Sequence, residues 1–424
     1  MDVLHEFNNL GDIRGSPLEK SIFFHLNQCT VKDLIGYSTS LSSFWNGYVL
    51  QVGHILGPVR HALISLGASH KSYLLRRSAN MSAMETQGYD NLAIQQYNKA
   101  ISGLTPIMTD PSPLDVQAIL ICCLIFVCID NINGRFGVAI RHLKSGSDLL
   151  KSIQNSTTAS IAAGAGTAGE LAKKTCDAGS LSDLSDMFER LGLDTSILVE
   201  DRLIHRQNFL TAAENQGPFL SSSAARAELH LIDLDHYELY CSEHYEDRCM
   251  ELQDGDCGEM AAKRRPTPED HVHDPEYLKV CDRFESWTSR FNQYLERIKY
   301  TPVSDAEFKE AMVLTLHEKI WRALLKEPPC CDSNPMVLQD FEDVLSQAEL
   351  VIPAIQDATH PIFSFEADTI PPVSFVASCC DDEGLQRRAI AMLRRINRTE
   401  GAWDSNRMAD LCELELATGK CTGE

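Results

Sequence analysis

The sequence predicts an all-α protein made of stacked helical hairpins, and three observations lead to this fold class. Apolar residues recur at three-to-four spacing through most of the 424 residues, as they do on amphipathic helices. The alternation of apolar and polar residues that marks half-buried strands is scarce. Serine and proline residues stand directly before apolar runs, where they favour the start of a helix. A chain of this length can bury a large core, as one long helical domain or as two to three packed halves.

Four consecutive helices are expected in the first part of the chain. Pro58 suits the first turn of the first helix, and Ser112 with Pro113 begins the third. The Asn-Ile-Asn-Gly turn at 131–134 ends that third helix. The residues around Ala93 and Ala139 loosely echo one another, which two stacked helical hairpins would explain. The four helices are expected over 58–74, 89–104, 113–129 and 136–153.

The third of these helices contains the longest apolar run of the chain. It covers the twelve residues 118–129. A helix needs roughly 20 apolar residues to cross a bilayer, so we expect this run to be a buried core helix. No association with a membrane is predicted.

Two polar segments divide the rest of the chain. Residues 155–180 are small, polar and of low complexity, which indicates a mobile loop or linker. A second polar insertion, 254–274, contains the Lys263-Arg264-Arg265-Pro266 cluster. Further helices are expected over 223–245, 276–298, 304–325 and 336–355, with two more between 371 and 401 and a last one over 407–417. Six segments are predicted: an N-terminal extension (1–18), an N-terminal helical half (19–153), a low-complexity linker (154–183), a middle helical segment (184–253), a polar insertion (254–274) and a C-terminal helical half (275–424).

The charge balance argues against non-specific binding of nucleic acid. The chain has 38 Lys and Arg against 60 Asp and Glu, a formal net charge of −22. Binding to nucleic acid depends on basic side chains that neutralise phosphates, so a DNA contact would need a local patch or a partner protein. Solubility is the preferred explanation of the negative charge, with an acidic binding surface as the alternative.

The 15 cysteines indicate a reducing compartment rather than a disulfide framework. Their number is odd, and the polar, acidic residues after Met1 do not form a secretory signal. We therefore expect reduced thiols in the cytosol or the nucleus. Several cysteines lie in apolar helical runs, where a thiol behaves as a small hydrophobic group. No Cys-x-x-Cys pair occurs anywhere, so these residues do not form a zinc binuclear cluster, which needs two such pairs.

The sequence contains two clusters of potential metal ligands, and each has a simpler explanation. The first, His271-Val272-His273-Asp274 with Glu276, ends a polar insertion, so a solvated loop is preferred to a metal site. The second is a run of acids and histidines on an expected helix, where a solvent-facing stripe is preferred to a cation site. Its members are His230, Asp233, Asp235, His236, Glu238, His244 and Glu246.

No catalytic constellation can be assembled from the sequence. Asp381-Asp382-Glu383 resembles the paired carboxylates of magnesium-diphosphate sites, but the acids are consecutive and a second motif is missing, so a turn and helix start is preferred. Gly146-Ser147 lacks the setting of a nucleophile elbow. No catalytic, cofactor-binding or metal residue is therefore predicted. Five histidines among apolar residues are expected to be core or interface histidines, namely His25, His54, His61, His70 and His317.

Four arginines near the C-terminus define two faces of an expected helix. Arg387 and Arg394 share one face, and Arg388 and Arg395 share the other, with Gly401 past the helix end. A solvated face paired with nearby acids is preferred. The alternatives are a nuclear-import patch together with Lys263, Arg264 and Arg265, or a surface for an acidic partner segment. Trp403 is expected to pack the following turn, and Asp404 or Ser405 to cap the last helix.

Three segments of the chain together resemble a known family. They are SFWNGYVLQVGH with RHALISLGASH (residues 43–70), QQYNKAISGL with LICCLIFVCIDNINGRFGVAIRHLKSGSDLL (95–150), and FSFEADTIPP through EGAWDS (363–405). Their order and spacing are similar to the regulatory region of the fungal zinc-cluster transcription factors, across about 23–416. None of the segments is catalytic.

The resemblance implies a helical regulatory domain that works in the nucleus and controls metabolic or secondary-metabolite biosynthetic genes. It also implies contacts with other transcription factors or co-regulators, as homo- or heterodimers, or with a small-molecule effector. The family reads DNA through an N-terminal zinc cluster, which this chain lacks, so direct DNA binding is not expected. An upstream cluster beyond Met1 is one alternative. Others are a non-transcriptional helical interaction module and an all-α enzyme.

Overall fold

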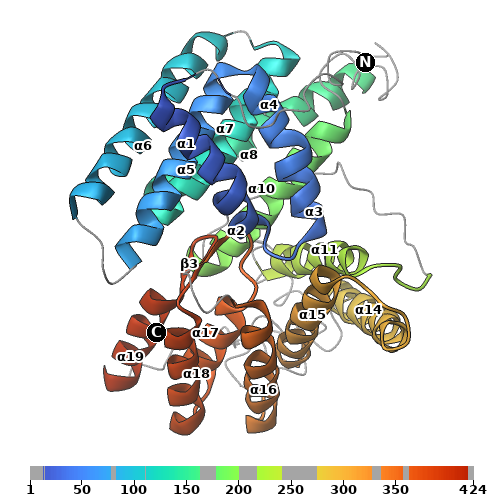
Figure 1. Ribbon diagram of the computed structural model, residues 1–424. Helices are drawn as coiled ribbons and strands as arrows, with labels where there is room; N and C mark the ends of the chain where they lie inside the picture. The colour runs from blue at the N-terminus through green and yellow to red at the C-terminus, as the bar shows by residue number, and fades with distance from the viewer. Residues whose placement is uncertain are drawn as a thin grey trace, which may run out of the picture.

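A computed structural model shows two layers of helices with a small sheet between them (Figure 1). The N-terminal helices form one layer, and the C-terminal helices, drawn from yellow to red, form the other. The predicted all-α fold class is confirmed. The structure describes Ile13 and residues 15–77, 83–109, 111–162, 178–199, 217–240, 275–326, 336–356 and 362–418.

The chain begins with short α-helices and two stretches of π-helix, which has wider turns. The Ser16 hydroxyl accepts a hydrogen bond from the Glu19 amide (3.3 Å), and the Glu19 carboxylate accepts one from the Ser16 amide (2.7 Å), so the first helix has a reciprocal cap. Two π-helical stretches interrupt the regular helix before the first long element. These elements are α1 (Pro17–His25), η1 (Leu26–Thr30), α2 (Val31–Ile35), α3 (Thr39–Ser42), η2 (Ser43–Val49) and α4 (Leu50–Ile55).

Two stacked helical hairpins follow, as the sequence predicts. The first consists of α5 (Gly57–Arg77) and α6 (Ala83–Leu104), and the second of α7 (Pro113–Ile132) and α8 (Phe136–Ala162). The two hairpins pack together through α5 and α7. Ser112 caps α7 as expected, and a short 3-10 turn, η3 (Thr105–Ile107), follows α6.

The fourth expected helix is longer than predicted. It was expected to end at Ile153 and to be followed by a loop, but α8 continues to Ala162, so the loop prediction is wrong for 155–162. Alanine, serine and threonine in this stretch give a low-complexity composition that is also compatible with a helix. The loop prediction is also wrong for 178–180, which begin the helix Ala178–Val199, and the rest of the expected linker, 163–177, lies outside the described residues.

The apolar helix α7 is the centre of the N-terminal layer. Its residues from Gln117 to Ile132 are buried. Within the described chain it is the helix long and apolar enough to cross a membrane, yet 78% of its most apolar window is covered by the rest of the protein. Burial raises the pKa of Cys123 to about 12, so the thiol stays neutral and packs as a small hydrophobic group. The prediction of a core helix is confirmed.

The described residues in the middle of the chain contribute five further helices. An aromatic cluster of Phe284, Trp287, Phe291 and Trp321 packs α14 against α15 and α11. Ser304 caps α15 with its hydroxyl. These helices are α10 (Ala178–Val199), α11 (Ser222–Tyr240), α14 (Pro275–Ile298), α15 (Asp305–Leu324) and α16 (Leu338–Ile355).

The C-terminal segment combines three helices with three strands of two residues each. Strand β1 pairs in parallel with β2, and β2 pairs antiparallel with β3. The sequence did not predict these strands, because two residues are too few to show a period. The elements are β1 (Phe363–Ser364), α17 (Ile370–Cys379), α18 (Glu383–Ile396), β2 (Thr399–Glu400), β3 (Trp403–Asp404) and α19 (Ser405–Thr418).

The start of α18 lies where the sequence predicts it, whereas the residue that ends the helix differs from the prediction. Asp382 caps the start, since its Oδ1 accepts a hydrogen bond from the Leu385 amide (2.9 Å), and the expected turn at 381–383 is confirmed. The end differs from the expectation. Asn397 terminates the helix in the left-handed conformation (φ 45°), whereas Gly401 (φ 54°) makes the turn between β2 and β3.

Residues of the C-terminal segment complete the N-terminal core. Phe363 and Phe365 belong to the same apolar cluster as α5 and α7, and the Phe365 ring lies 5.8 Å from the Trp45 ring. The Phe365 amide donates a hydrogen bond to the Leu34 carbonyl (3.3 Å). The two layers are therefore joined by shared apolar packing as well as by this hydrogen bond.

Candidate functional site

A group of buried charged side chains lies where the two layers meet, and we call it the junction network. It draws on α10, α11, α15, the connection from β1 to α17, and β2. Its members, each at least nine-tenths buried, are Arg190, Arg226, Glu310, Glu366, Asp368, Arg398 and Glu400.

Arg226 on α11 connects most of the acids in this network. Its Nε donates to Glu310 Oε1 (2.9 Å), and its Nη1 donates to Asp368 Oδ1 (2.8 Å). The other oxygen of Glu310 accepts hydrogen bonds from the hydroxyls of Ser222 (2.7 Å) and Ser223 (3.0 Å). A buried carboxylate is tolerated only when its lone pairs are satisfied in this way. Arg226 therefore holds α11, α15 and the β1–α17 connection in one arrangement.

Asp368 is the acid with the most contacts to other elements. It accepts a hydrogen bond from the Tyr37 hydroxyl, and His317 Nε2 lies 3.0 Å from its backbone oxygen. Burial alone would raise the pKa of Asp368, but Arg226, His317 and the Arg226 and Tyr37 hydrogen bonds outweigh burial and lower that pKa to about 2. Asp368 is thus ionised at neutral pH and links the N-terminal residue Tyr37 to the C-terminal layer.

Glu400 ties together two distant parts of the C-terminal segment. Its side chain is fully buried and accepts hydrogen bonds from the backbone amides of Asp368 (2.9 Å), Thr369 (2.8 Å) and Ile370 (2.9 Å). These amides form the start of α17, where a negative charge is favoured by the helix dipole. Arg398 Nε lies 3.0 Å from the Glu400 carboxylate. The FSFEAD and EGAWDS segments of the sequence are therefore parts of one structural unit.

Helix α10 joins the same network from the N-terminal side. Arg190 pairs with Glu366 (2.5 Å) and with Asp186 (3.0 Å). Asp194 accepts a hydrogen bond from the Ala367 amide (3.1 Å), and its backbone oxygen accepts one from Trp403 Nε1 (3.0 Å). Burial, together with nearby Glu366 and Asp368, raises the pKa of Asp194 well above its usual value. Trp403 packs the turn as predicted and also contacts α10.

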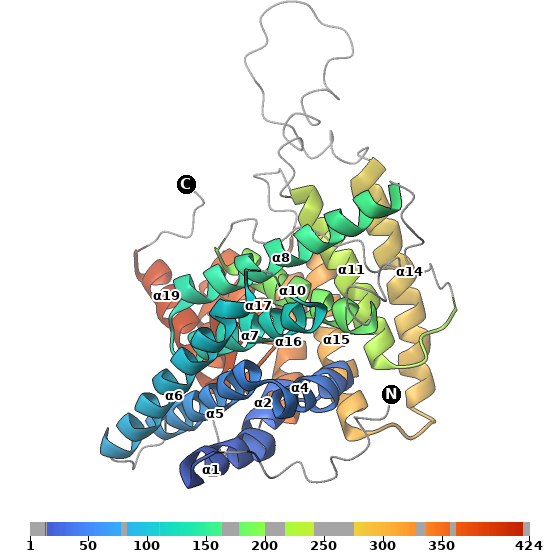
Figure 2. The same cartoon turned by 90° about the horizontal axis from the view of Figure 1, so that it is seen from above.

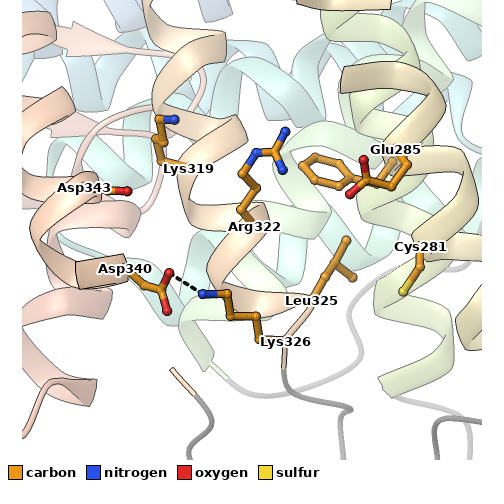
Figure 3. Close-up of a pocket in the computed structure, with 9 residues that line it drawn as sticks. Cys281, Glu285, Lys319, Arg322, Leu325, Lys326, Asp340 and Asp343 are labelled. Atoms are coloured by element: carbon orange, nitrogen blue, oxygen red, sulfur yellow. Dashed lines mark hydrogen bonds and ion pairs between the residues drawn. The ribbon is translucent and has the colours of Figure 1, made fainter. Parts of the chain in front are cut away.

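A surface pocket of about 450 Å³ lies among α14, α15 and α16 (Figure 3). Acidic and basic groups both line it, together with the apolar side chains of Phe284 and Leu325. Lys326 pairs with Asp340 (2.6 Å), and Arg322 pairs through Nε with Glu318 (2.5 Å). This combination suits a small polar molecule that carries charged groups, rather than a purely apolar ligand.

The structure corrects the interpretation of the acidic helix. The expected solvent-facing stripe is wrong for the described part of α11, where Asp233 accepts a hydrogen bond from Trp321 Nε1 (2.6 Å) and Asp235 pairs with Arg283. Burial raises the pKa of Asp233 to about 7 and lowers the pKa of His236 to about 4. Within the described part of the chain, no group of three or more His, Cys, Asp and Glu side chains could hold a metal ion.

Three of the four arginines of α18, Arg387, Arg388 and Arg394, are paired with acids, as preferred from the sequence. Arg388 bonds to Glu342 (2.7 Å) and Glu349 (2.8 Å) on α16, and Arg394 bonds to Asp410 (2.5 Å) on α19. Asp404 is one of the two expected caps of α19. Its Oδ1 accepts hydrogen bonds from the backbone amides of Asn406 and Arg407, which lie in the first turn of that helix. His271 to Asp274, Lys263 to Arg265, His244 and Glu246 lie outside the described residues.

Two of the five expected core histidines, His70 and His317, have contacts of the kind that was predicted. His70 is fully buried and lies within 3.1 Å of Thr30 Oγ1 and 3.0 Å of Asp33 Oδ2. His317 contacts the junction network. The sequence did not single out the network's own acids and arginines, although Glu366 and Asp368 stand among apolar residues of a family-like segment, which is a signal for buried charge.

Comparison with known proteins identifies the N-terminal layer. Residues 23–188, from α1 into α10, match a family model described as the fungal specific transcription factor domain. The N-terminal layer is thus similar to the fungal specific transcription factor domain. The resemblance drawn from the sequence is thereby confirmed, and the domain contributes Tyr37 directly to the junction network.

Two curated proteins to which this chain is similar are transcription regulators by name. The transcription regulator lscL of Purpureocillium lilacinum is 32% identical over 97 residues, which are 22% of each chain. The aspercryptin biosynthesis cluster-specific transcription regulator atnN of Emericella nidulans is 31% identical over 104 residues, 24% of this chain and 17% of that protein. The match thus spans about a fifth of each relative's length. No solved structure matches the chain.

Proposed function

We propose that this protein is a nuclear, non-enzymatic regulator of transcription that controls metabolic or secondary-metabolite biosynthetic genes. The observation that carries the proposal is the fungal specific transcription factor domain at 23–188. The names of the two relatives support it, since both describe transcription regulators and one refers to a biosynthetic cluster. Its partners are other transcription factors or co-regulators.

The arrangement of the pocket and the junction network supports a role in receiving a signal. Helix α15 lines the pocket with Lys319 and Arg322, and the same helix carries Glu310 and His317 of the network contacts. A small charged effector bound in the pocket would contact a helix that is fixed to the N-terminal layer through Arg226. A shift of α15 would then also move its contacts with the junction network, where the two layers meet. Coupling between two sites requires a structural element of this kind that contacts both of them.

The function is tested by deletion of the gene and by tagging the protein at its chromosomal locus. We expect fluorescence in the nucleus, and loss or gain of transcripts from a contiguous set of biosynthetic genes after deletion. Tagged protein that stays in the cytoplasm, together with unchanged transcripts, would overturn the proposal and favour a non-transcriptional interaction module. Mapping of the 5′ end of the transcript decides whether DNA recognition is encoded upstream in the same gene.

The role of the pocket needs a variant that keeps the fold. Arg322→Ala changes a lining residue whose side chain is 41% exposed, so the free energy of unfolding is expected to change little. It should alter the transcript response while the amount of nuclear protein stays constant. Arg387→Ala is the matched control, because Arg387 is an exposed arginine on α18 that also pairs with an acid four residues earlier. Equal transcript profiles for both variants would exclude the pocket from signalling.

A further inference from the structure

Two histidines from different helices meet at their ring nitrogens in the N-terminal layer. Helix α1 lies at the edge of this layer in the view of Figure 2 and packs on α5. His25 ends α1 and is half-buried, whereas His70 on α5 is fully buried. His25 Nε2 lies 3.3 Å from His70 Nδ1, while the two ring centroids are 5.5 Å apart. Because the nitrogens are so much closer than the ring centres, the rings meet edge to edge, and one proton fits between the nitrogens.

The other partners of His70 fix where its protons lie. His70 Nε2 is 3.0 Å from Asp33 Oδ2 on α2. An ionised carboxylate only accepts hydrogen bonds, so Nε2 carries a proton. On the other side of the ring, Nδ1 lies 3.1 Å from Thr30 Oγ1 as well as 3.3 Å from His25 Nε2. When His70 takes a second proton, at Nδ1, the charge of Asp33 compensates it, and His25 must stay neutral in order to accept the hydrogen bond.

A proton on His25 is therefore disfavoured in the folded protein. With both rings protonated, two N–H groups of like charge would face each other across 3.3 Å. Burial, then the charges of His70 and Lys71, lower the pKa of His25 from 6.5 to about 4. The docked His25 thus excludes a proton that a solvated imidazole takes up near neutral pH.

Other ionisable groups lie around the pair. The Tyr73 ring is 6.3 Å from the His70 ring, and burial raises the pKa of Tyr73, so this phenol stays neutral. His54 on α4 lies 5.3 Å from the Phe23 ring of α1, and burial with nearby Arg60 lowers the pKa of His54. The further charged or titratable residues on α1, η1, α2, the end of α5 and the neighbouring α6 are Glu19, Lys20, Cys29, Lys32, Arg76, Arg77, Asp90 and Lys99.

The pair holds α1 and η1 on α5 where the backbones approach closely. A Cβ atom added at Gly67, one turn before the histidine of α5, would lie 3.1 Å from the Ile22 carbonyl oxygen and 3.1 Å from Leu26 Cβ. The same segment leads into α2, whose Leu34 carbonyl accepts the hydrogen bond of the Phe365 amide (3.3 Å). A change in the docking of α1 and η1 would therefore reach the place where the two layers are joined.

We propose that His25 and His70 form an acid-sensitive latch, which releases α1 and η1 from α5 as the pH falls below neutrality. A released His25 can take up the proton that the docked ring excludes, so acid favours the released form. A base with a lowered pKa in the folded state contributes stability that is present above its unfolded value, and this stability is lost as the pH falls from 6.5 toward 4. The inference is independent of the proposed regulatory function.

The latch is tested by amide hydrogen exchange of the full chain, read by mass spectrometry. Between about pH 7.5 and pH 5.5, the protection factors of the α1 amides should fall about tenfold, as expected when release is coupled to one proton on an imidazole. The amides of α18, a helix without histidine, are the internal reference, and their protection should stay within about twofold. Equal protection of α1 at both pH values would overturn the proposal.

A pair of variants assigns the effect to His25. His25→Gln should remove the pH dependence, because a glutamine amide can bond to His70 but does not titrate in this range. His61→Gln is the matched control, since His61 on α5 is also half-buried but bonds to Gln96 (2.7 Å), and it should keep the tenfold loss. A tenfold loss that persists in His25→Gln would overturn the proposal.

A measurement on the wild type keeps the result independent of how the variants fold. Exchange of the imidazole C2 hydrogen, followed in the peptide that carries His25, gives the pH at which this ring is half protonated. That midpoint should lie at least about one pH unit below the ordinary histidine value of about 6.5. A midpoint at the ordinary value would overturn the latch.

Discussion

Arg226 illustrates how one buried residue can fix the relative position of several elements. Its guanidinium contacts Glu310 on α15 and Asp368 before α17, while α11 carries the arginine itself. Removal of one partner from a buried group of charges strongly lowers the free energy of unfolding. The remaining charges lose their ion-pair partner but stay buried, so water does not hydrate them. Surface pairs behave differently, since water screens both charges.

Replacement of Arg226 by methionine should lower the free energy of unfolding by about 3–5 kcal/mol, because buried Glu310 and Asp368 would be left without their partner. Arg387→Met, at an exposed pair, should change that free energy by less than about 1 kcal/mol. Urea denaturation followed by circular dichroism measures both values. Equal values for the two variants would show that the junction network does not stabilise the fold.

Asp233 should make stability depend on pH near neutrality. Burial raises its pKa from 3.8 to about 7. A raised folded-state pKa contributes stability that is present below the unfolded value and is lost as the pH rises from about 4 to 7. The wild type should therefore lose stability relative to Asp233→Asn over this range, by on the order of 2–4 kcal/mol. Denaturation at several pH values measures the difference, and a constant difference would contradict the prediction.

At the scale of single elements, the contact between α8 and α10 depends on a glycine. A Cβ atom added at Gly146 would lie 2.2 Å from Cε1 of the buried Phe188 ring, closer than atoms can approach. Gly146, which was weighed as part of a nucleophile elbow, lies inside α8 and lets α10 pack closely. Its function is in packing.

Gly146→Ala should lower the free energy of unfolding by roughly 1–3 kcal/mol, because the Phe188 ring must move within a packed core. Gly137→Ala in the same helix meets nothing within 4 Å and should raise that free energy by up to about 1 kcal/mol. Thermal denaturation of the two variants gives opposite shifts of Tm if the close contact is real. Shifts of the same sign would contradict it.

The helices could be predicted from the sequence, whereas the sheet and the junction network could not. Long amphipathic runs such as 276–298 give a strong period, so α14 and α15 begin and end within one residue of the expected positions. Strands of two residues have no period. The pairs of the network, such as Arg190 with Glu366, are separated by 176 residues, and a single sequence contains no sign of such a pairing.

At the scale of the whole molecule, the two layers share one core. Phe363 and Phe365 come from the C-terminal segment but pack with Trp45 and Tyr73 of the N-terminal layer. The domain that the family model matches, 23–188, is thus incomplete as a packed unit without these residues. We expect the layers to unfold together.

Phe365→Ala should lower the free energy of unfolding by about 3–5 kcal/mol and should affect both layers, because it opens a cavity where they meet. Chains that keep only Trp45 or only Trp287 report on the N-terminal and C-terminal layers through tryptophan fluorescence. Both reporters should show the same urea midpoint, shifted equally by the substitution. Separate midpoints would show that the layers unfold independently.

The hydrogen bond between Phe365 and Leu34 has a consequence for the order of events during synthesis. At translation rates of about 5–20 residues per second, the chain between the end of α10 and Phe365 takes on the order of ten to thirty seconds to make. During that interval the helices of the N-terminal layer can form, but the apolar surface that Phe363 and Phe365 later cover is exposed to water. The nascent chain therefore presents a temporary apolar surface, which a ribosome-associated chaperone would be suited to cover until the C-terminal segment emerges.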